Sequence, residues 1–235
     1  MDRVRKTLDK SACTAVNAST TTYVFDAYGT LFDVHSAVAR LASRIGPDAA
    51  AFSELWRARQ LEYSWTSSLM DCYVDFWVLT QRSLDYAMAR YGMDDMKLRS
   101  DLLGAYLELD TYAEVSDVLR RLKQAGKAIA ILSNGTPAML RSAVASAGLA
   151  SMVDSVLSVD AIGVYKPDPR VYRHALDMLA VDAAVVSFQS SNAWDVAGAR
   201  RFGLPVVWVN RRGWPMEYGE TGGAQEVASL AELLC

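Results

Sequence analysis

Five short apolar segments alternate with stretches of helical spacing, and this alternation constrains the fold more than any other feature of the sequence. The segments span residues 21–25, 127–133, 151–159, 183–189 and 204–210. Short runs rich in β-branched residues and bounded by turn residues are typical of buried strands. Buried strands that alternate with helices predict a parallel sheet covered on both faces. We therefore expect an α/β fold with a doubly wound, Rossmann-like parallel sheet.

The core helices are expected between these strands and after the last one. Apolar residues recur with helical spacing at 115–126, 136–149, 168–180, 192–203 and 224–234. The last of these segments should form a helix that packs back on the sheet.

The pattern changes between the first strand and about residue 112. Four helical segments follow one another there with no strand between them, at 36–45, 49–70, 71–92 and 94–109. We expect a helical cap subdomain at 34–111, inserted into a core domain formed by 23–33 and 112–235. An insertion at the carboxyl edge of a parallel sheet would cover the edge where ligands bind in such folds.

Composition narrows the possible partners and location. The net charge of -3 and the absence of a basic run argue against a nucleic-acid partner. No window holds 18 uninterrupted apolar residues, so we expect no membrane partner. Residues 1–22 lack the apolar run of a secretory signal and are expected to form a flexible leader. The scattered cysteines indicate no disulfide framework and favour a cytoplasmic location; they are Cys13, Cys72 and Cys235.

Polar side chains follow the predicted strands at their carboxyl ends. Asp26 follows the first strand, Ser133 and Asn134 the second, Lys166 the third, and the run 190–195 the fourth. Each motif alone has an ordinary explanation, since Ser-Asn-Gly is a common turn and Lys-Pro-Asp-Pro a common helix entry. Their convergence on one edge of the sheet favours a functional site.

Five separated blocks carry a resemblance to a known family. "FDAYGTLFDVH", "LWRARQLEYSW", "ILSNG", "VYKPDPRVY" and "SSNAWDVAGARRFG" resemble the haloacid dehalogenase superfamily and, within it, the L-2-haloacid dehalogenases. The resemblance covers nearly the whole chain from Tyr23 onward. It implies hydrolysis of short L-2-haloalkanoic acids to D-2-hydroxyacids and halide, without a cofactor, through an ester on Asp26. It also implies a homodimer.

The resemblance assigns catalytic roles. Asp26 is implied to be the nucleophile, with Thr30 and Lys166 holding its carboxylate. Asn192 and Asp195 are implied to orient and deprotonate the water that hydrolyses the ester. Supporting members complete the implied catalytic set: Ser190 and Tyr172.

The resemblance also assigns binding roles. Arg57 and Asn134 are implied to receive the halide. Ser133 and the backbone amide of Ala27 are implied to bind the substrate carboxylate. The haloalkyl group would meet an apolar pocket, although core packing explains some of its members equally well. The implied lining residues are Tyr28, Leu61, Phe76 and Trp194.

Two positions separate this chain from the phosphatases of the superfamily. Those enzymes carry a second Asp two residues after the nucleophile, where this chain has Tyr28, and a departing halide needs no proton donor. They also supply paired acids for Mg²⁺ near the fourth strand, where this chain has Ser191 and Asn192 before Asp195. We therefore expect no metal and no cofactor.

Three alternatives stay open on the sequence. A hydrolase of another small 2-substituted acid, such as fluoroacetate or a cyclic imino acid, would use the same mechanism. A Mg²⁺-dependent phosphatase is the second, and Tyr28 and Asn192 argue against it. A non-catalytic binding module that retains the fold is the third, and it is disfavoured because the chain retains the implied functional residues Asp26, Arg57, Lys166, Asn192 and Asp195.

Overall fold

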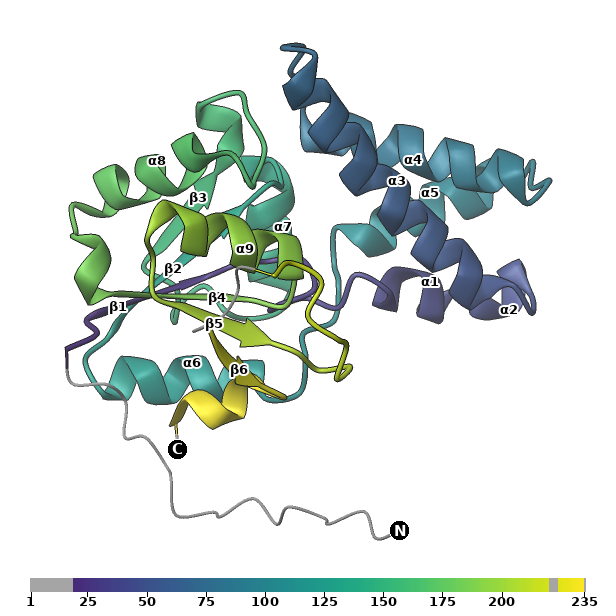
Figure 1. Cartoon of the computed structure of the whole chain (residues 1–235). Helices are drawn as coiled ribbons and strands as arrows, with labels where there is room; N and C mark the ends of the chain where they lie inside the picture. The colour runs from purple at the N-terminus through teal and green to yellow at the C-terminus, as the bar shows by residue number, and fades with distance from the viewer. Residues whose placement is uncertain (1–18, 220–223, 235) are drawn as a thin grey trace, which may run out of the picture.

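A parallel sheet forms the centre of the computed structural model, which describes residues 19–219 and 224–234 (Figure 1). The strands lie in the order β3-β2-β1-β4-β5-β6, and every neighbouring pair is parallel. The winding reverses at β1, which pairs with both β2 and β4. This confirms the predicted doubly wound α/β fold. The bounds are Thr22–Phe25 (β1), Ala128–Ser133 (β2), Ser155–Ser158 (β3), Val186–Ser190 (β4), Val206–Val209 (β5) and Gln225–Val227 (β6).

Helices cover both faces of the sheet. The helices α8 and α9 lie together on one face, whereas α6 packs with the C-terminal 3-10 turn η3 on the other (Figure 1). Strands enclosed between such layers have no polar face, which explains why β1 is buried along its whole length. The bounds are Val115–Gln124 (α6), Pro137–Ser146 (α7), Pro169–Leu179 (α8), Ala193–Phe202 (α9) and Leu230–Leu234 (η3).

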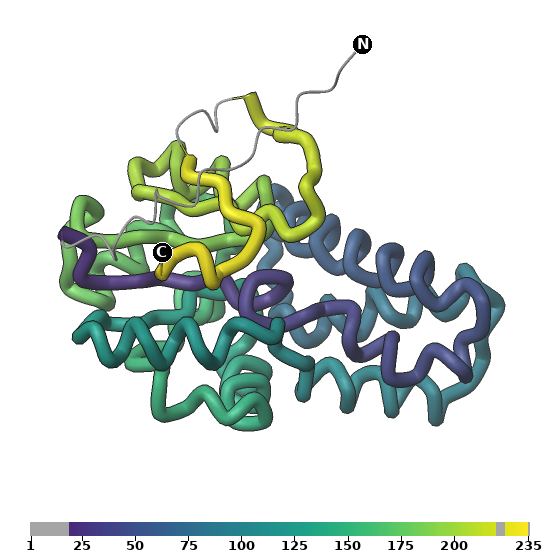
Figure 2. The backbone as a smooth tube through the Cα atoms, turned by 90° about the horizontal axis from the view of Figure 1, so that it is seen from below, coloured from purple at the N-terminus to yellow at the C-terminus, as the bar shows by residue number. Residues whose placement is uncertain are grey.

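Between β1 and α6 the chain forms successive helices, and none of the sheet strands lies between them. These helices gather beyond one end of the sheet, and α3 lies along α4 (Figures 1 and 2). The division into a cap at 34–111 and a two-segment core stays a prediction. The bounds are Ser36–Arg40 (α1), Ala42–Ile45 (α2), Ala49–Leu69 (α3), Phe76–Arg90 (α4) and Met96–Tyr106 (α5).

The prediction of a helix at 224–234 is wrong. Its first part is strand β6, which pairs with β5, and its second part is the 3-10 turn η3. The buried residues Val227, Leu230 and Leu233 recur every third position, which fits a helix as well as a 3-10 turn. The free edge of β5 decides the outcome. A strand that pairs with this edge satisfies the backbone N–H and C=O groups of β5, whereas a helix at the same place would leave them without partners in the sheet.

The N-terminal leader lies mostly outside the described residues, which begin at residue 19. Cys13 and Cys235 also lie outside them, whereas Cys72 is a free, exposed thiol. Across residues 19–219 and 224–234, no helix has both the length and the apolar character needed to cross a bilayer.

A glycine permits the close approach of α9 to the start of α8. A Cβ atom built on Gly198 would lie 2.4 Å from Pro167 Cβ and 2.7 Å from the Tyr172 hydroxyl. Side chains beside this contact belong to the sheet edge where the predicted site lies, so Gly198 helps to place that site.

We predict that Gly198→Ala lowers the free energy of unfolding by about 1–3 kcal/mol, because the added methyl group overpacks this contact. Urea denaturation followed by circular dichroism measures it. The matched control is Gly104→Ala in α5, where an added Cβ meets no atom within 4 Å. That change should raise the free energy of unfolding by about 1 kcal/mol, since alanine is the better helix former. A gain of stability in both variants would contradict the prediction.

Candidate active site

Asp26 follows β1 directly and is only 4% exposed. Its Oδ2 accepts hydrogen bonds from Thr30 Oγ1 at 3.0 Å and Asn192 Nδ2 at 2.8 Å, and its Oδ1 accepts one from Lys166 Nζ at 3.0 Å. Gly29 adopts a φ of 91°, which allows the chain to turn back so that Thr30 reaches the carboxylate. Three donors from three separate segments therefore fix one carboxylate at the end of the central strand.

Lys166 is fully buried and lies between two carboxylates. Its Nζ donates to Asp26 Oδ1 and to Asp195 Oδ2, each at 3.0 Å, and sits 5.1 Å from the centre of the Phe188 ring. Its backbone N–H donates to Asn134 Oδ1 at 3.1 Å. Asn134 thus ties the turn after β2 to the lysine that holds Asp26.

The protonation states of Lys166 and Asp195 follow from their burial and from the charges next to them. Burial acts to lower the pKa of Lys166, but Asp195 and Asp26 together raise it above its ordinary value. Burial raises the pKa of Asp195, while Lys166 and the hydrogen bond from Tyr172 oppose that rise. The lysine is therefore charged at neutral pH, and Asp195 binds a proton more readily than an exposed aspartate.

Asp195 lies in the first turn of α9 with no solvent exposure. The Tyr172 hydroxyl donates to its Oδ1 at 2.7 Å. Ser190 is also buried, and its Oγ accepts the Asn192 backbone N–H at 3.2 Å. Tyr172 and Ser190 therefore hold the two residues that the sequence predicted to act on water.

The two residues implied to bind the substrate carboxylate are Ser133, at the end of β2, and Ala27, in the turn after β1. Ser133 is fully buried, and its Oγ accepts the Gly135 N–H at 3.1 Å. Ala27 is also buried, and its carbonyl accepts the N–H groups of Thr30 and Leu31. Both residues lie at the predicted edge, and both make bonds that shape their own turns.

Arg57 reaches from α3 to the turn after β1. Its Nη2 lies 3.4 Å from the Tyr28 carbonyl, and its Nη1 donates to Gln60 Oε1 at 2.8 Å. Gln60 is fully buried and also bonds to Thr80 and Tyr106. No carboxylate lies within ion-pair distance of Arg57 among the described residues, so its charge is available to an anion.

The aromatic ring of Tyr28 lies in a closed apolar cluster. It stacks on Tyr106 with centroids 5.7 Å apart and lies 6.1 Å from Phe76. Its hydroxyl is buried without a hydrogen-bond partner in the described structure. Burial raises the pKa of Tyr28 well above its ordinary value, so the hydroxyl is a poor proton donor.

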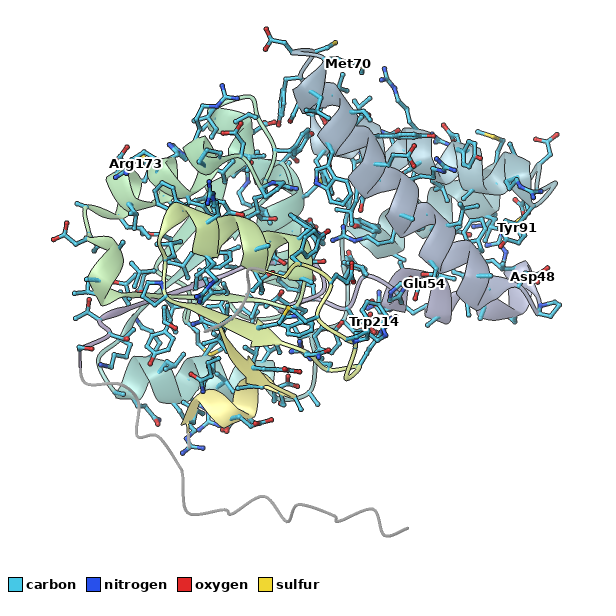
Figure 3. All side chains as sticks on the ribbon, in the orientation of Figure 1. Asp48, Glu54, Met70, Tyr91, Arg173 and Trp214 are labelled. Atoms are coloured by element: carbon cyan, nitrogen blue, oxygen red, sulfur yellow. The ribbon has the colours of Figure 1, made fainter. Side chains whose placement is uncertain are left out.

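A cavity of about 300 Å³ lies beside Asn192, between α3 and the loop after β5. Glu54 and Trp214 both line this cavity and lie near each other at the junction of the helical unit and the core (Figure 3). Asp26 does not line the cavity. The cavity therefore lies next to the Asp26 carboxylate and does not enclose it. Four residues predicted from the sequence are on its wall: Arg57, Leu61, Asn192 and Trp194.

The geometry includes residues that the sequence patterns did not assign to the site. Gln60 and Tyr106 support Arg57, and the sequence indicated Ser191 only as a weak metal ligand. The spacing of three between Arg57 and Gln60 on one helix is the signal that could have found Gln60. Tyr106 comes from a helix whose position relative to α3 no local pattern fixes.

The side chains of the site offer few ligands to a metal ion. Among residues 19–219 and 224–234, no three His, Cys, Asp or Glu side chains are grouped to hold one. Asp26 and Asp195 share the Lys166 ammonium. The expectation of a metal-free, cofactor-free site stays a prediction.

Comparison with known proteins assigns the family. A model of the haloacid dehalogenase-like hydrolases matches residues 20–203, and the chain belongs to this family. It is 50% identical over 211 residues to (S)-2-haloacid dehalogenase 4A of Burkholderia cepacia, and the aligned residues make up 89% of this chain and 91% of that protein. The predicted resemblance to the L-2-haloacid dehalogenases is thereby confirmed.

Solved structures agree with this assignment. A dehalogenase crystal structure at 49% identity superposes with a TM-score of 0.90 over 92% of this chain and 96% of that chain. The L-2-haloacid dehalogenase of Xanthobacter autotrophicus with covalently bound chloropropionic acid gives a TM-score of 0.82 at 36% identity, over 92% and 97%.

We predict that Tyr172→Phe raises the pKa of Asp195 further. The hydroxyl donates to the carboxylate and so favours its charged form, and its removal leaves the protonated form relatively more stable. A carbon-13 NMR titration of the aspartate carboxyl groups measures the change.

The matched control is Tyr165→Phe, because the Tyr165 hydroxyl donates to the Val74 carbonyl at 2.6 Å. An Asp195 titration that stays in place in Tyr172→Phe, or moves equally in both variants, would contradict the prediction.

Proposed function

We propose that the protein hydrolyses short L-2-haloalkanoic acids to D-2-hydroxyacids and halide through an ester on Asp26. The observation that carries this proposal is the Asp26 carboxylate, held by Lys166, Thr30 and Asn192 at the carboxyl end of β1. The Lys166 ammonium, 3.0 Å from Oδ1, holds this carboxylate in place, and an oriented carboxylate can act as a nucleophile. Its close relatives include curated (S)-2-haloacid dehalogenases.

The first step is displacement at C2 of the substrate. A carboxylate oxygen of Asp26 attacks C2 from the side opposite the halogen, the carbon–halogen bond breaks, and the halide leaves with the bonding electrons. Halide is the anion of a strong acid and needs no proton as it leaves. The buried hydroxyl of Tyr28, with its raised pKa, suits this chemistry better than the departure of an alkoxide.

The departing halide and the substrate carboxylate are both anionic, and each needs a positively charged group or a hydrogen-bond donor beside it. Arg57 has no carboxylate partner among the described residues, so its guanidinium can receive the halide together with the Asn134 amide. Ser133 and the Ala27 amide are proposed to bind the substrate carboxylate. For Ser133 this requires its hydroxyl to donate to the substrate while its oxygen accepts from Gly135.

The second step is hydrolysis of the Asp26 ester. Asn192 Nδ2 lies 2.8 Å from Asp26 Oδ2, where it can polarise the ester carbonyl. Asp195 shares Lys166 with Asp26, and its raised pKa suits a base that takes a proton from water. Water attacks the carboxyl carbon of Asp26, the bond from that carbon to the ester oxygen breaks, and the departing hydroxyacid oxygen takes up the proton that Asp195 received from water. No bond to C2 breaks in this step, so C2 is inverted only once. An L substrate therefore gives a D product.

We predict that the purified protein releases chloride from L-2-chloropropionate, forms D-lactate, and leaves the D enantiomer unreacted. Ion chromatography measures the halide, and chiral chromatography measures the product. Asp26→Ala should lose turnover by at least about 10³-fold, since no other group forms the ester.

A chromogenic phosphate ester with Mg²⁺ is the control substrate. Phosphate release that a chelator abolishes, without halide release from any haloacid, would overturn the proposal in favour of a phosphatase. A panel of chloro-, bromo- and fluoroacids then identifies the preferred halogen.

We also propose that the protein is a cytoplasmic homodimer. The end of α3 supports an interface between copies, because Leu69 is 87% exposed and Met70, at the tip of the helical unit, is 68% exposed (Figure 3). Light scattering should give about twice the chain mass of 25.8 kDa. A monomer mass at micromolar concentration would contradict the dimer.

A further inference from the structure

The loop after β5 carries an arginine that no step above uses. Arg211 Nη1 donates to Ser191 Oγ at 3.1 Å, and its Nη2 donates to the Thr30 carbonyl at 3.0 Å. The same Nη2 pairs with Glu114 at 2.7 Å, and the guanidinium lies 3.9 Å from the centre of the Tyr112 ring. The Arg211 side chain is only 16% exposed. One guanidinium therefore joins three segments that are far apart in the sequence.

These contacts lead directly to the proposed nucleophile. The Ser191 N–H donates to Thr30 Oγ1 at 2.8 Å, and Thr30 Oγ1 donates to Asp26 Oδ2 at 3.0 Å. Ser191 Oγ also donates to the Gly29 carbonyl at 2.6 Å. Arg211 thus fixes both the turn after β1 and the turn after β4, and these two turns meet at the Asp26 carboxylate.

The loop itself is held in place on the sheet. The buried Asn210 donates its backbone N–H to Val227 in β6 at 2.8 Å. Its side chain exchanges two hydrogen bonds with the backbone of Trp214, each at 2.9 Å. Bonds to β6 and to the Trp214 backbone therefore hold the loop that carries Arg211.

The charge of Arg211 is already compensated. Glu114 neutralises it, whereas Arg57 has no carboxylate partner among the described residues. Arg211 is therefore suited to hold protein groups and not a substrate anion. A planar guanidinium can serve Ser191, Thr30 and Glu114 at once, which the single ammonium of a lysine cannot do with the same geometry.

We propose that Arg211 is a positioning residue that orients the Asp26 carboxylate through Thr30 and Ser191. Its kinetic consequence rests on the function proposed above. Because Arg211 does not touch the reacting atoms, its loss should slow the chemical step more than it weakens substrate binding.

The test compares Arg211→Gln with the wild-type protein on L-2-chloropropionate. We expect kcat to fall about 10- to 100-fold, because misplacing a reacting group by about 1 Å can cost about 100-fold. KM should change by less than about threefold, since ground-state binding is kept. Arg211→Lys keeps the charge opposite Glu114 and should give an intermediate kcat, and it serves as the folded variant if Arg211→Gln does not fold.

The matched control is Arg99→Gln. Arg99 in α5 is likewise paired with a carboxylate, that of Asp85 in α4, through two hydrogen bonds, and its side chain is 23% exposed, but this pair lies in the helical unit. Its loss should leave kcat unchanged. An equal fall of kcat in Arg99→Gln and Arg211→Gln would mean a general loss of stability and would overturn the positioning role.

Crystal structures of the same variants provide a readout that does not depend on turnover. The hydrogen bond from Thr30 to Asp26 should be lost or lengthened in Arg211→Gln and kept in Arg99→Gln. An intact bond in Arg211→Gln would overturn the inference. Absence of halide release by the wild-type protein would instead overturn the proposed function, and the two structures would still decide the role of Arg211.

Discussion

The fully buried ammonium of Lys166, placed between the carboxylates of Asp26 and Asp195, is the interaction on which the site depends. Two buried carboxylates without a cation would repel each other and would take up protons. Removing one partner of such a buried arrangement typically costs about 3–5 kcal/mol. The Lys166 ammonium holds both carboxylates at 3.0 Å, which is the arrangement that the proposed nucleophile and the proposed base require.

The sheet explains how such distant residues meet. Asp26, Lys166 and Asp195 are separated by 140 and 29 residues along the chain, yet each follows a strand whose carboxyl end lies at the same edge. The switch in winding at β1 leaves room there, which is where ligands bind in open α/β sheets. The helix α3 then brings Arg57 to this edge from the helical unit. The core thus provides the proposed nucleophile, and the helical unit provides an arginine with no carboxylate partner among the described residues.

Most of the fold and the central site could be predicted from the sequence, for a specific physical reason. Strand periodicity and strand-end polar residues are local signals, and they are sufficient to locate Asp26, Lys166 and Asp195. The missing parts depend on contacts between distant segments. β6 exists because β5 offers it an edge, and the roles of Gln60 and Arg211 depend on partners in other helices and loops. Ser133 was predicted as a binding group, but only the structure shows that its oxygen already accepts a bond from Gly135.

The central claim is that Asp26 becomes covalently bonded to the substrate. A single turnover in heavy-oxygen water, with the protein in excess over a 2-haloacid, tests it most directly. Mass spectrometry of the peptide that contains Asp26 should find the heavy oxygen in its carboxylate, while the first hydroxyacid formed carries ordinary oxygen. Heavy oxygen in that first product, with Asp26 unlabelled, would mean that water attacks the substrate directly and would contradict the account.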